Sequence, residues 1–348
     1  MKIALTGGGT AGHVMPNLAL VPSLKKHFDQ ILYIGGGGME KKLVRDLPFF
    51  EIPTVKLERK LTISNLCIPF KLHKAVRESK QILREQRPDV LFSKGGYVGL
   101  PVVVAAHRLG IPVVIHESDM TLGLANKISK NYADYVCTAF SDTARTLPNG
   151  IFTGTPIRRE LAFGKKSKTL AECGFEGNRA ILLVTGGSLG AQFLNGLVRK
   201  HLDELLEEFD VIHLCGKGNL DPSIHKKGYF QAEFCDHMED YYAAAEYVLS
   251  RAGSNTINEI AFLQKPALLI PLPKGNSRGD QIENAKYFEK LGLALVLFQE
   301  DAAHFVSSVS KLRREKPRLV ENMRKADTQN ACDKITKILV DCTKKNKF

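Results

Sequence analysis

The chain has 348 residues, enough for two domains of ordinary size that each bury a core. Its 44% hydrophobic and 25% charged residues are values of a globular protein, and no apolar run approaches the roughly 18 residues of a membrane-spanning helix. The net charge of +12 favours an acidic partner, and the 7 scattered cysteines, none in a Cys-x-x-Cys pair, argue against a disulfide framework and a thiolate zinc site.

Short apolar segments alternate with amphipathic segments along the first half of the chain. Five segments have the continuous apolar character of buried parallel strands: residues 2–5, 31–34, 90–92, 113–115 and 135–137. Helical patterns lie between them at residues 16–26, 70–87 and 102–109. This alternation predicts a doubly wound parallel sheet.

The same pattern restarts in the second half. A strand at 180–184 leads through a glycine turn at 186–190 into a helix at 191–206. Further strands are expected at 211–214, 247–249, 267–270 and 294–297, and one or two charged helices from residue 319 onward. We therefore expect an α/β fold of two Rossmann-like, doubly wound domains that face a cleft. The first is residues 1–158 with 331–348 packing back onto it, and the second is residues 159–330, after a linker near 158–177.

The first strand runs into the loop Gly7-Gly8-Gly9-Thr10-Ala11-Gly12-His13, which satisfies G-x-G-x-x-G between a strand and a helix. This motif is typical of NAD binding. The second expected strand, however, continues into four glycines at 35–38, without the acid that would bind the ribose of a dinucleotide. We therefore expect no cofactor, and for this single loop a tight turn without a ligand remains an alternative.

Three further glycine-bearing turns follow expected strands, at residues 93–99, 186–190 and 251–256. Ligands of open α/β sheets bind at the carboxyl ends of the strands, which is where these turns lie. No P-loop sequence is present. Glu259 follows the third turn, and its carboxylate could bind both hydroxyls of a ribose. Thr256-Ile257-Asn258-Glu259 also fits a helix capping box, and the local pattern does not separate the two.

Seven segments together carry a family resemblance: residues 6–13, 94–98, 116–117 with 123–127, 153–158, 186–191, 250–254 with Glu259, and 280–281 with 284–285. In this order they resemble the MurG family of glycosyltransferases, which have the GT-B fold and act in peptidoglycan synthesis. The resemblance implies transfer of N-acetylglucosamine from UDP-N-acetylglucosamine to the 4-hydroxyl of the muramyl sugar of lipid I, with inversion. The product would be lipid II.

The resemblance also implies roles for single residues. Glu259 would bind the ribose, Ser188 the pyrophosphate and Arg158 the nucleotide. The remaining implied substrate-binding residues are Ser254, Asn255, Thr256, Asp280 and Gln281 for the donor sugar or phosphate, Cys235 by its backbone for the uracil, Thr10, Ala11 and Gly12 where donor and acceptor meet, and Lys94, Tyr97 and Asn126 on the acceptor side. The chain departs from the family pattern at Ala11, Asp119, Leu189 and Asp280.

An inverting transfer needs a base for the acceptor hydroxyl. His13 is the first candidate, because the positive end of a helix dipole keeps its imidazole neutral. Asp119 is the second, since it is a carboxylate where the family has an amide. His116 and Glu117 directly follow an expected strand and are expected to brace the loop. No carboxylate pair suits Mg²⁺, so no metal is expected.

Residues 56–87 contain nine basic residues against three acids, around an apolar cluster at 66–70. Apolar side chains ringed by Lys and Arg suit an anionic bilayer surface, although a solvated helix face has the same pattern. We expect a peripheral enzyme on the cytoplasmic face of the bacterial cell membrane and no binding of nucleic acid. A transferase for another lipid-linked acceptor and a non-catalytic nucleotide-sugar-binding subunit remain alternatives.

Overall fold

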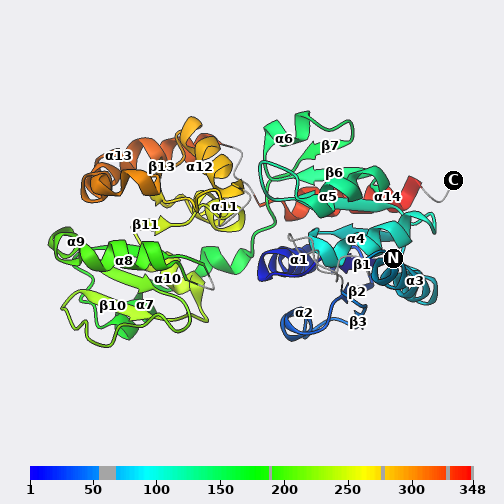
Figure 1. Cartoon of the computed structure of the whole chain (residues 1–348), viewed down its shortest axis with the longest axis horizontal. Coiled ribbons are helices and arrows are strands. Elements are labelled where there is room, and N and C mark those ends of the chain that lie inside the picture. The colour runs from blue at the N-terminus through cyan, green and yellow to red at the C-terminus, as the bar shows by residue number, and fades with distance from the viewer. Residues whose placement is uncertain (55–67, 188–189, 276–278, 327–329, 346–348) are drawn as a thin grey trace. The chain divides into compact units, whose positions relative to one another are not determined.

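The computed structural model describes residues 1–54, 68–187, 190–275, 279–326 and 330–345. They form two compact units (Figure 1). The first unit comprises Met1–Arg158 and Asn330–Phe348, and the second comprises Arg159–Gln329. The chain therefore leaves the first unit after Arg158 and returns to it for its last helix.

The first unit is built on a parallel sheet of seven strands in the order β3-β2-β1-β4-β5-β6-β7. Their bounds are β1 (Lys2–Thr6), β2 (Gln30–Gly35), β3 (Phe49–Glu51), β4 (Val90–Ser93), β5 (Val113–Glu117), β6 (Tyr135–Thr138) and β7 (Gly150–Phe152). The strand order reverses between β1 and β4, and such a switch point is where doubly wound sheets bind ligands.

Helices cover both faces of this sheet: α1 (Ala11–Leu24), α2 (Met39–Leu43), α3 (Ile68–Gln86), α4 (Gly96–His107), α5 (Leu124–Ser129), α6 (Ser141–Arg145) and α14 (Cys332–Lys345). Successive β1 side chains point to opposite faces, so Leu5 packs with α1 and α14 while Ala4 packs in a separate core with α3 and α4. Ile335 and Leu339 of α14 are fully buried in the first of these cores. The apolar face of the C-terminal helix thus completes the first unit.

The second unit has a parallel sheet of six strands in the order β10-β9-β8-β11-β12-β13. The strands are β8 (Ala180–Thr185), β9 (Phe209–Leu214), β10 (Tyr229–Ala232), β11 (Tyr247–Ser250), β12 (Ala267–Leu269) and β13 (Leu295–Val296). The helices are α7 (Lys166–Cys173), α8 (Gln192–Lys200), α9 (Leu202–Glu208), α10 (Met238–Ala244), α11 (Ser254–Phe262), α12 (Asp280–Lys290) and α13 (Phe305–Lys325), with 3-10 turns η3 (Arg159–Phe163) and η4 (Gln299–His304). The order around β8 repeats the order around β1.

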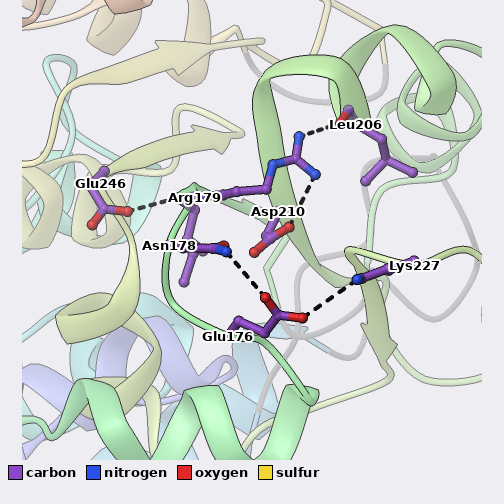
Figure 2. Close-up of polar contacts among 8 residues, drawn as sticks. Glu176, Asn178, Arg179, Leu206, Asp210, Lys227 and Glu246 are labelled. Carbon is purple, nitrogen blue, oxygen red and sulfur yellow. Dashed lines mark hydrogen bonds and ion pairs between the residues drawn. The ribbon is translucent and has the colours of Figure 1, made fainter.

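The amino-terminal edge of the second sheet is tied together by charged side chains (Figure 2). The guanidinium of Arg179 lies 3.4 Å from an Asp210 carboxylate oxygen and also donates to the carbonyl of Leu206. Lys227 pairs with Glu176 at 3.5 Å. Burial raises the pKa of Asp210, and the charge of Arg179 opposes that shift. These contacts join the loops at the amino-terminal ends of the strands. The glycine-bearing turns lie at the opposite, carboxyl-terminal ends.

The ten strands that the sequence predicts are all present, each within two residues of its expected ends. Two expectations for the second unit are wrong. The expected helix at 191–206 is two helices, α8 and α9, because the backbone of His201 leaves the helical region at φ −111° and ψ 27°. The expected linker at 158–177 contains η3 and α7, which pack against α10.

Candidate functional site

The loop after β1 is held in place by the loop after β4. Gly9 has φ +88°, and a β-carbon there would overlap the ring of Tyr97. A β-carbon on Gly96 would lie 3.2 Å from Nδ1 of His13. Thr10 is the N-cap residue of α1, and its hydroxyl lies 2.9 Å from that same ring nitrogen. The two loops at the switch point are therefore in close contact.

Ala11 and Gly12 are the first two residues of α1, and both are half-buried. His13 follows them in the first turn of the helix and is also half-buried. The three residues lie where the helix dipole is positive, as the sequence predicts. Arg158 lies apart from this loop in the chain, as the last residue of the first stretch of the unit, and is half-buried.

Lys94 follows β4 and is only 2% exposed. Its ammonium donates a hydrogen bond to the hydroxyl of Ser118. Burial lowers the pKa of Lys94 to about 8, and the nearby carboxylates of Glu117 and Asp119 oppose that shift. Asp119, the second candidate base, therefore interacts electrostatically with a buried cation.

Glu117 braces the loop that follows β5. Its carboxylate accepts hydrogen bonds from the backbone N–H groups of Ser118 at 2.9 Å, Asp119 at 3.0 Å and Gly123 at 2.9 Å. The side-chain amide of Asn126 donates to it as well, at 3.0 Å. A carboxylate with so many donors is fixed in position and is an acceptor already in use. Asn126 thus helps to shape the loop after β5 from within.

His116 is fully buried, with Nε2 2.8 Å from the carbonyl oxygen of Gly154. Burial, and then the charge of Lys94, hold the pKa of His116 well below its ordinary value. The ring is therefore neutral at pH 7 and serves as a support between β5 and the segment after β7.

In the second unit the loop after β8 is pinned beside the end of β9. Gly190 has φ +72°, and a β-carbon there would overlap the carbonyl oxygen of Cys215. The same carbonyl accepts a hydrogen bond of 2.8 Å from the side chain of Asn195 on α8. Ser188 and Leu189 lie outside the described residues, so the expected pyrophosphate contact of Ser188 stays a prediction.

The capping box that the sequence left open as an alternative role for Thr256 and Glu259 is not formed. Helix α11 begins two residues earlier, with Gly253 as its N-cap, so Ser254, Asn255 and Thr256 form its first turn. Glu259 is the sixth helical residue and cannot reach the N-cap amide. It is half-buried, with a carboxylate oxygen 3.4 Å from the hydroxyl of Tyr242. The capping role that the sequence left open for Glu259 is therefore excluded.

Asp280 and Gln281 are the first two residues of α12. The side-chain oxygen of Gln281 accepts a hydrogen bond of 3.0 Å from the N–H of Leu272, so this side chain holds the segment after β12. Cys235 follows β10, and burial raises the pKa of its thiol to about 12. The thiol is therefore protonated at neutral pH.

Arg251 is a functional candidate to which the sequence analysis assigned no role. It directly follows β11 and is 7% exposed. Its guanidinium donates to the carbonyl oxygens of Ile270 at 3.0 Å and Pro271 at 3.3 Å, and it lies 5.9 Å from the ring centre of Phe193. A basic residue placed directly between a buried strand and a glycine turn is the signal that could have identified it.

Across the described ranges, His, Cys, Asp and Glu side chains form no group of three or more that could hold a metal ion. None of the helices in the described residues has both the length and the apolar content needed to cross a membrane.

Two parallel-sheet units, each with its candidate ligand residues on loops at the carboxyl edge, define the class of GT-B glycosyltransferases. The chain matches the glycosyltransferase family 28 N-terminal domain over residues 3–138 and the family 28 C-terminal domain over residues 181–338. It belongs to glycosyltransferase family 28, in the branch of the UDP-N-acetylglucosamine–N-acetylmuramyl-(pentapeptide) pyrophosphoryl-undecaprenol N-acetylglucosamine transferases.

Relatives of that name share much of the sequence. The transferase of Clostridium botulinum strain 657 is 46% identical, covering 99% of this chain and 99% of its own, and that of Clostridium tetani is 43% identical, covering 97% of each. The crystal structure of Acinetobacter baumannii MurG is similar with a TM-score of 0.76 at 25% identity, over 98% of this chain and 99% of that one. The calicheamicin glycosyltransferase CalG4, at 14% identity and a TM-score of 0.68, covers 99% of this chain and 98% of its own and shares the fold.

Proposed function

We propose that this chain transfers N-acetylglucosamine from UDP-N-acetylglucosamine to the 4-hydroxyl of the muramyl residue of lipid I, giving lipid II with inversion at the transferred sugar. The observation that carries the proposal is the likeness to transferases of that name, 46% identity over 99% of both chains. The intact glycine loops of both units support it, because a non-catalytic subunit has no need to keep both.

The donor is assigned to the second unit. Glu259 would bind the ribose. Backbone N–H groups would come from the first turn of α11, which contains Ser254, Asn255 and Thr256. Asp280 and Gln281, at the start of α12, would lie near the sugar. Ser188, Arg158 and the backbone at Cys235 complete the proposed set for the pyrophosphate, the nucleotide and the uracil. The leaving UDP gains negative charge, which helix amino ends and a guanidinium stabilise.

The acceptor is assigned to the first unit. The proposed contacts are the residues that open α1, namely Thr10, Ala11 and Gly12, together with Lys94, Tyr97 and Asn126 on the loops after β4 and β5. These three loops follow β1, β4 and β5, which are neighbours in the sheet. Their residues therefore lie at one edge of the first unit.

His13 is the base that the geometry favours over Asp119. The hydroxyl of Thr10 orients the His13 ring, and the amino end of α1 disfavours its protonated form. Asp119 interacts electrostatically with the ammonium of Lys94. A carboxylate already engaged with a cation is less available to a substrate hydroxyl.

The membrane is the proposed route to a lipid-linked acceptor. Helix α3 buries Val76 and Leu83 in the core of the first unit, while Phe70 on the same helix is 80% exposed. Lys71 and Lys74 are exposed next to it. An apolar side chain beside exposed cations suits an anionic lipid surface. Residues 55–67, which contain three of the nine basic residues of the expected patch and part of its apolar cluster, lie outside the described residues. We propose a peripheral location on the cytoplasmic face of the bacterial membrane and no role for nucleic acid.

The test is a transfer assay with UDP-N-acetylglucosamine and a short-chain lipid I analogue. We expect UDP release that requires the acceptor and a disaccharide product that mass spectrometry identifies. Release with a different lipid-linked sugar but not with the lipid I analogue would show another acceptor specificity. Tight donor binding without turnover on any acceptor would indicate the binding subunit.

A further inference from the structure

The carboxylate of Glu40 occupies the glycine loop of the first unit. Glu40 lies in the first turn of α2 and is 5% exposed. Its Oε1 accepts a hydrogen bond of 2.6 Å from the backbone N–H of Gly9. A β-carbon on Gly8 would overlap the same oxygen, so the carboxylate lies directly against the loop backbone. An internal anion thus uses the amide that a phosphate would need.

In a strand–glycine loop–helix unit, the loop amides and the amino end of the helix bind the phosphates of a nucleotide. Glu40 reaches this position because the four glycines before it, with Gly38 at φ +73°, turn the chain from β2 back toward β1. The phenol of Tyr33 donates to the carbonyl of Gly7 at 2.6 Å and fixes the loop from the strand side. No ion pair to Glu40 occurs among the described residues, and its carboxylate contacts the amide of Gly9.

The second unit has a different arrangement at the corresponding place. β9 lies beside β8 as β2 lies beside β1, and residues 215–220, which follow β9, contain no acid. The atom nearest to a β-carbon on Gly190 is the backbone carbonyl oxygen of Cys215. The carboxylate of Glu233 does contact this segment, but at the exposed amide of Gly218, at 2.7 Å. The segment after β9 therefore supplies no carboxylate to Gly190 as α2 supplies Glu40 to the loop after β1.

We propose that Glu40 is a specificity-determining residue: its carboxylate fills the anion position of the first glycine loop, so that a nucleoside diphosphate binds only to the second unit. The inference rests on the proposed use of a UDP-sugar as donor. Like charges at one site repel strongly, so free UDP would be excluded from the loop assigned to the acceptor. The pyrophosphate of the acceptor would have to bind away from the amide of Gly9.

The test measures inorganic pyrophosphate binding to the full chain by calorimetry, with saturating UDP present to fill the second unit. Glu40→Gln removes the charge but can still accept the hydrogen bond of Gly9, and Glu40→Ala opens the position. We expect negligible binding to the wild type and a gain of at least about tenfold in affinity in both variants, because a like charge is removed. In the transfer assay, UDP should then compete with the acceptor as well as with the donor.

Glu85→Gln is the matched control. It makes the same change in charge at the exposed carboxyl end of α3, where Glu85 accepts a hydrogen bond from Gln81, and should bind pyrophosphate as the wild type does. Three results would overturn the inference: pyrophosphate binding by the wild type as tight as that of the variants, no gain in either variant while circular dichroism shows a folded protein, or an equal gain in the control. The binding experiment needs no turnover, so absence of transfer would count against the proposed function alone.

Discussion

Replacing Glu259 with alanine tests the donor site in the second unit most directly. Glu259 is half-buried on the second turn of α11, one turn beyond the residues proposed to hold the donor phosphate or sugar. A carboxylate there can accept hydrogen bonds from both hydroxyls of a ribose. With the capping box excluded, the variant removes the proposed ribose-binding carboxylate without removing a helix cap.

The size of the effect follows from the partial burial of the carboxylate. Hydrogen bonds to a charged group contribute about 1.5–3 kcal/mol when formed inside a protein. A half-buried carboxylate belongs near the middle of that range, about 2 kcal/mol, which corresponds to about a 30-fold rise in the donor KM. Glu259→Gln keeps one acceptor oxygen and should raise the donor KM by about 3- to 10-fold.

The assay is UDP release at varied donor and fixed, saturating acceptor. The donor KM should rise while kcat falls less, because the ribose contact is present in the ground state and in the transition state. Two control variants test whether a change in the donor KM is specific to the carboxylate of Glu259. Tyr242→Phe removes a hydroxyl 3.4 Å from the carboxylate, a contact at the outer limit of a hydrogen bond, and should change the donor KM by less than about threefold. Glu289→Ala removes an exposed acid at the far end of α12 and should leave it unchanged.

A ribose contact of Glu259 would be refuted if the folded Glu259→Ala protein has a donor KM within twofold of the wild-type value. An equal rise in the Glu289 control would also refute it, because it would reflect net charge. A selective fall in kcat would instead move Glu259 from ribose binding to the reacting centre.

Three further residue-level predictions and one on metals follow from the same structure. His13→Ala should lower kcat by about 10²-fold or more with donor binding intact, and Asp119→Asn should lower it less; the reverse ranking would make Asp119 the base. Charge reversal at Lys71 and Lys74 should weaken binding to anionic vesicles, and salt should weaken wild-type binding; equal binding to neutral vesicles would contradict this. The pKa of Lys94 is about 8 in the folded chain and 10.5 when unperturbed. Between these two pH values Lys94 is protonated in the unfolded chain but largely deprotonated in the folded chain. The free energy of unfolding therefore rises with pH from about 8 to 10.5. Relative to Lys94→Met, urea unfolding should show a gain of up to about 3 kcal/mol between the two pH values, and no gain would contradict the shift. Activity should survive a chelator, and complete, reversible loss would show a required metal.

The sequence predicted the strands that lie inside each sheet and missed most of those at the edges. β1, β4, β5, β8 and β11 are buried on both faces, which requires continuous apolar runs. β3 and β7 are the edges of the first sheet and β10 is one edge of the second, and their residues are mostly only partly buried. An edge strand pairs on one side only, so its sequence carries a weaker apolar signal. All three missed strands are edges.

The candidate site, like the sheets, could be predicted only in part from the sequence. The positions of the glycine loops could be predicted, because parallel strands direct the loops that follow them to one edge of the sheet. The contacts of Glu40 and Arg251 could not, because they depend on where short elements pack. The capping box at Thr256 failed for a similar reason: Thr-x-x-Glu is a local pattern, whereas the start of α11 is set by the turn at Gly253.

The two units place a buried cation at the same point of the sheet, and its surroundings differ. Lys94 follows β4, the neighbour of β1, and Arg251 follows β11, the neighbour of β8. Burial lowers the pKa of both. Lys94 lies near the carboxylates of Glu117 and Asp119, which offset its charge, whereas Arg251 donates to two carbonyl oxygens, which carry no net charge.

In the proposed function, the charge of Arg251 would face the diphosphate of the donor, whereas carboxylates offset the charge of Lys94. The role proposed for Glu40 acts in the same direction, because its carboxylate lies against the first glycine loop. On this proposal, the same α/β architecture occurs twice in the chain with different electrostatic surroundings, one for the diphosphate of the donor and one for the hydroxyl that attacks the sugar.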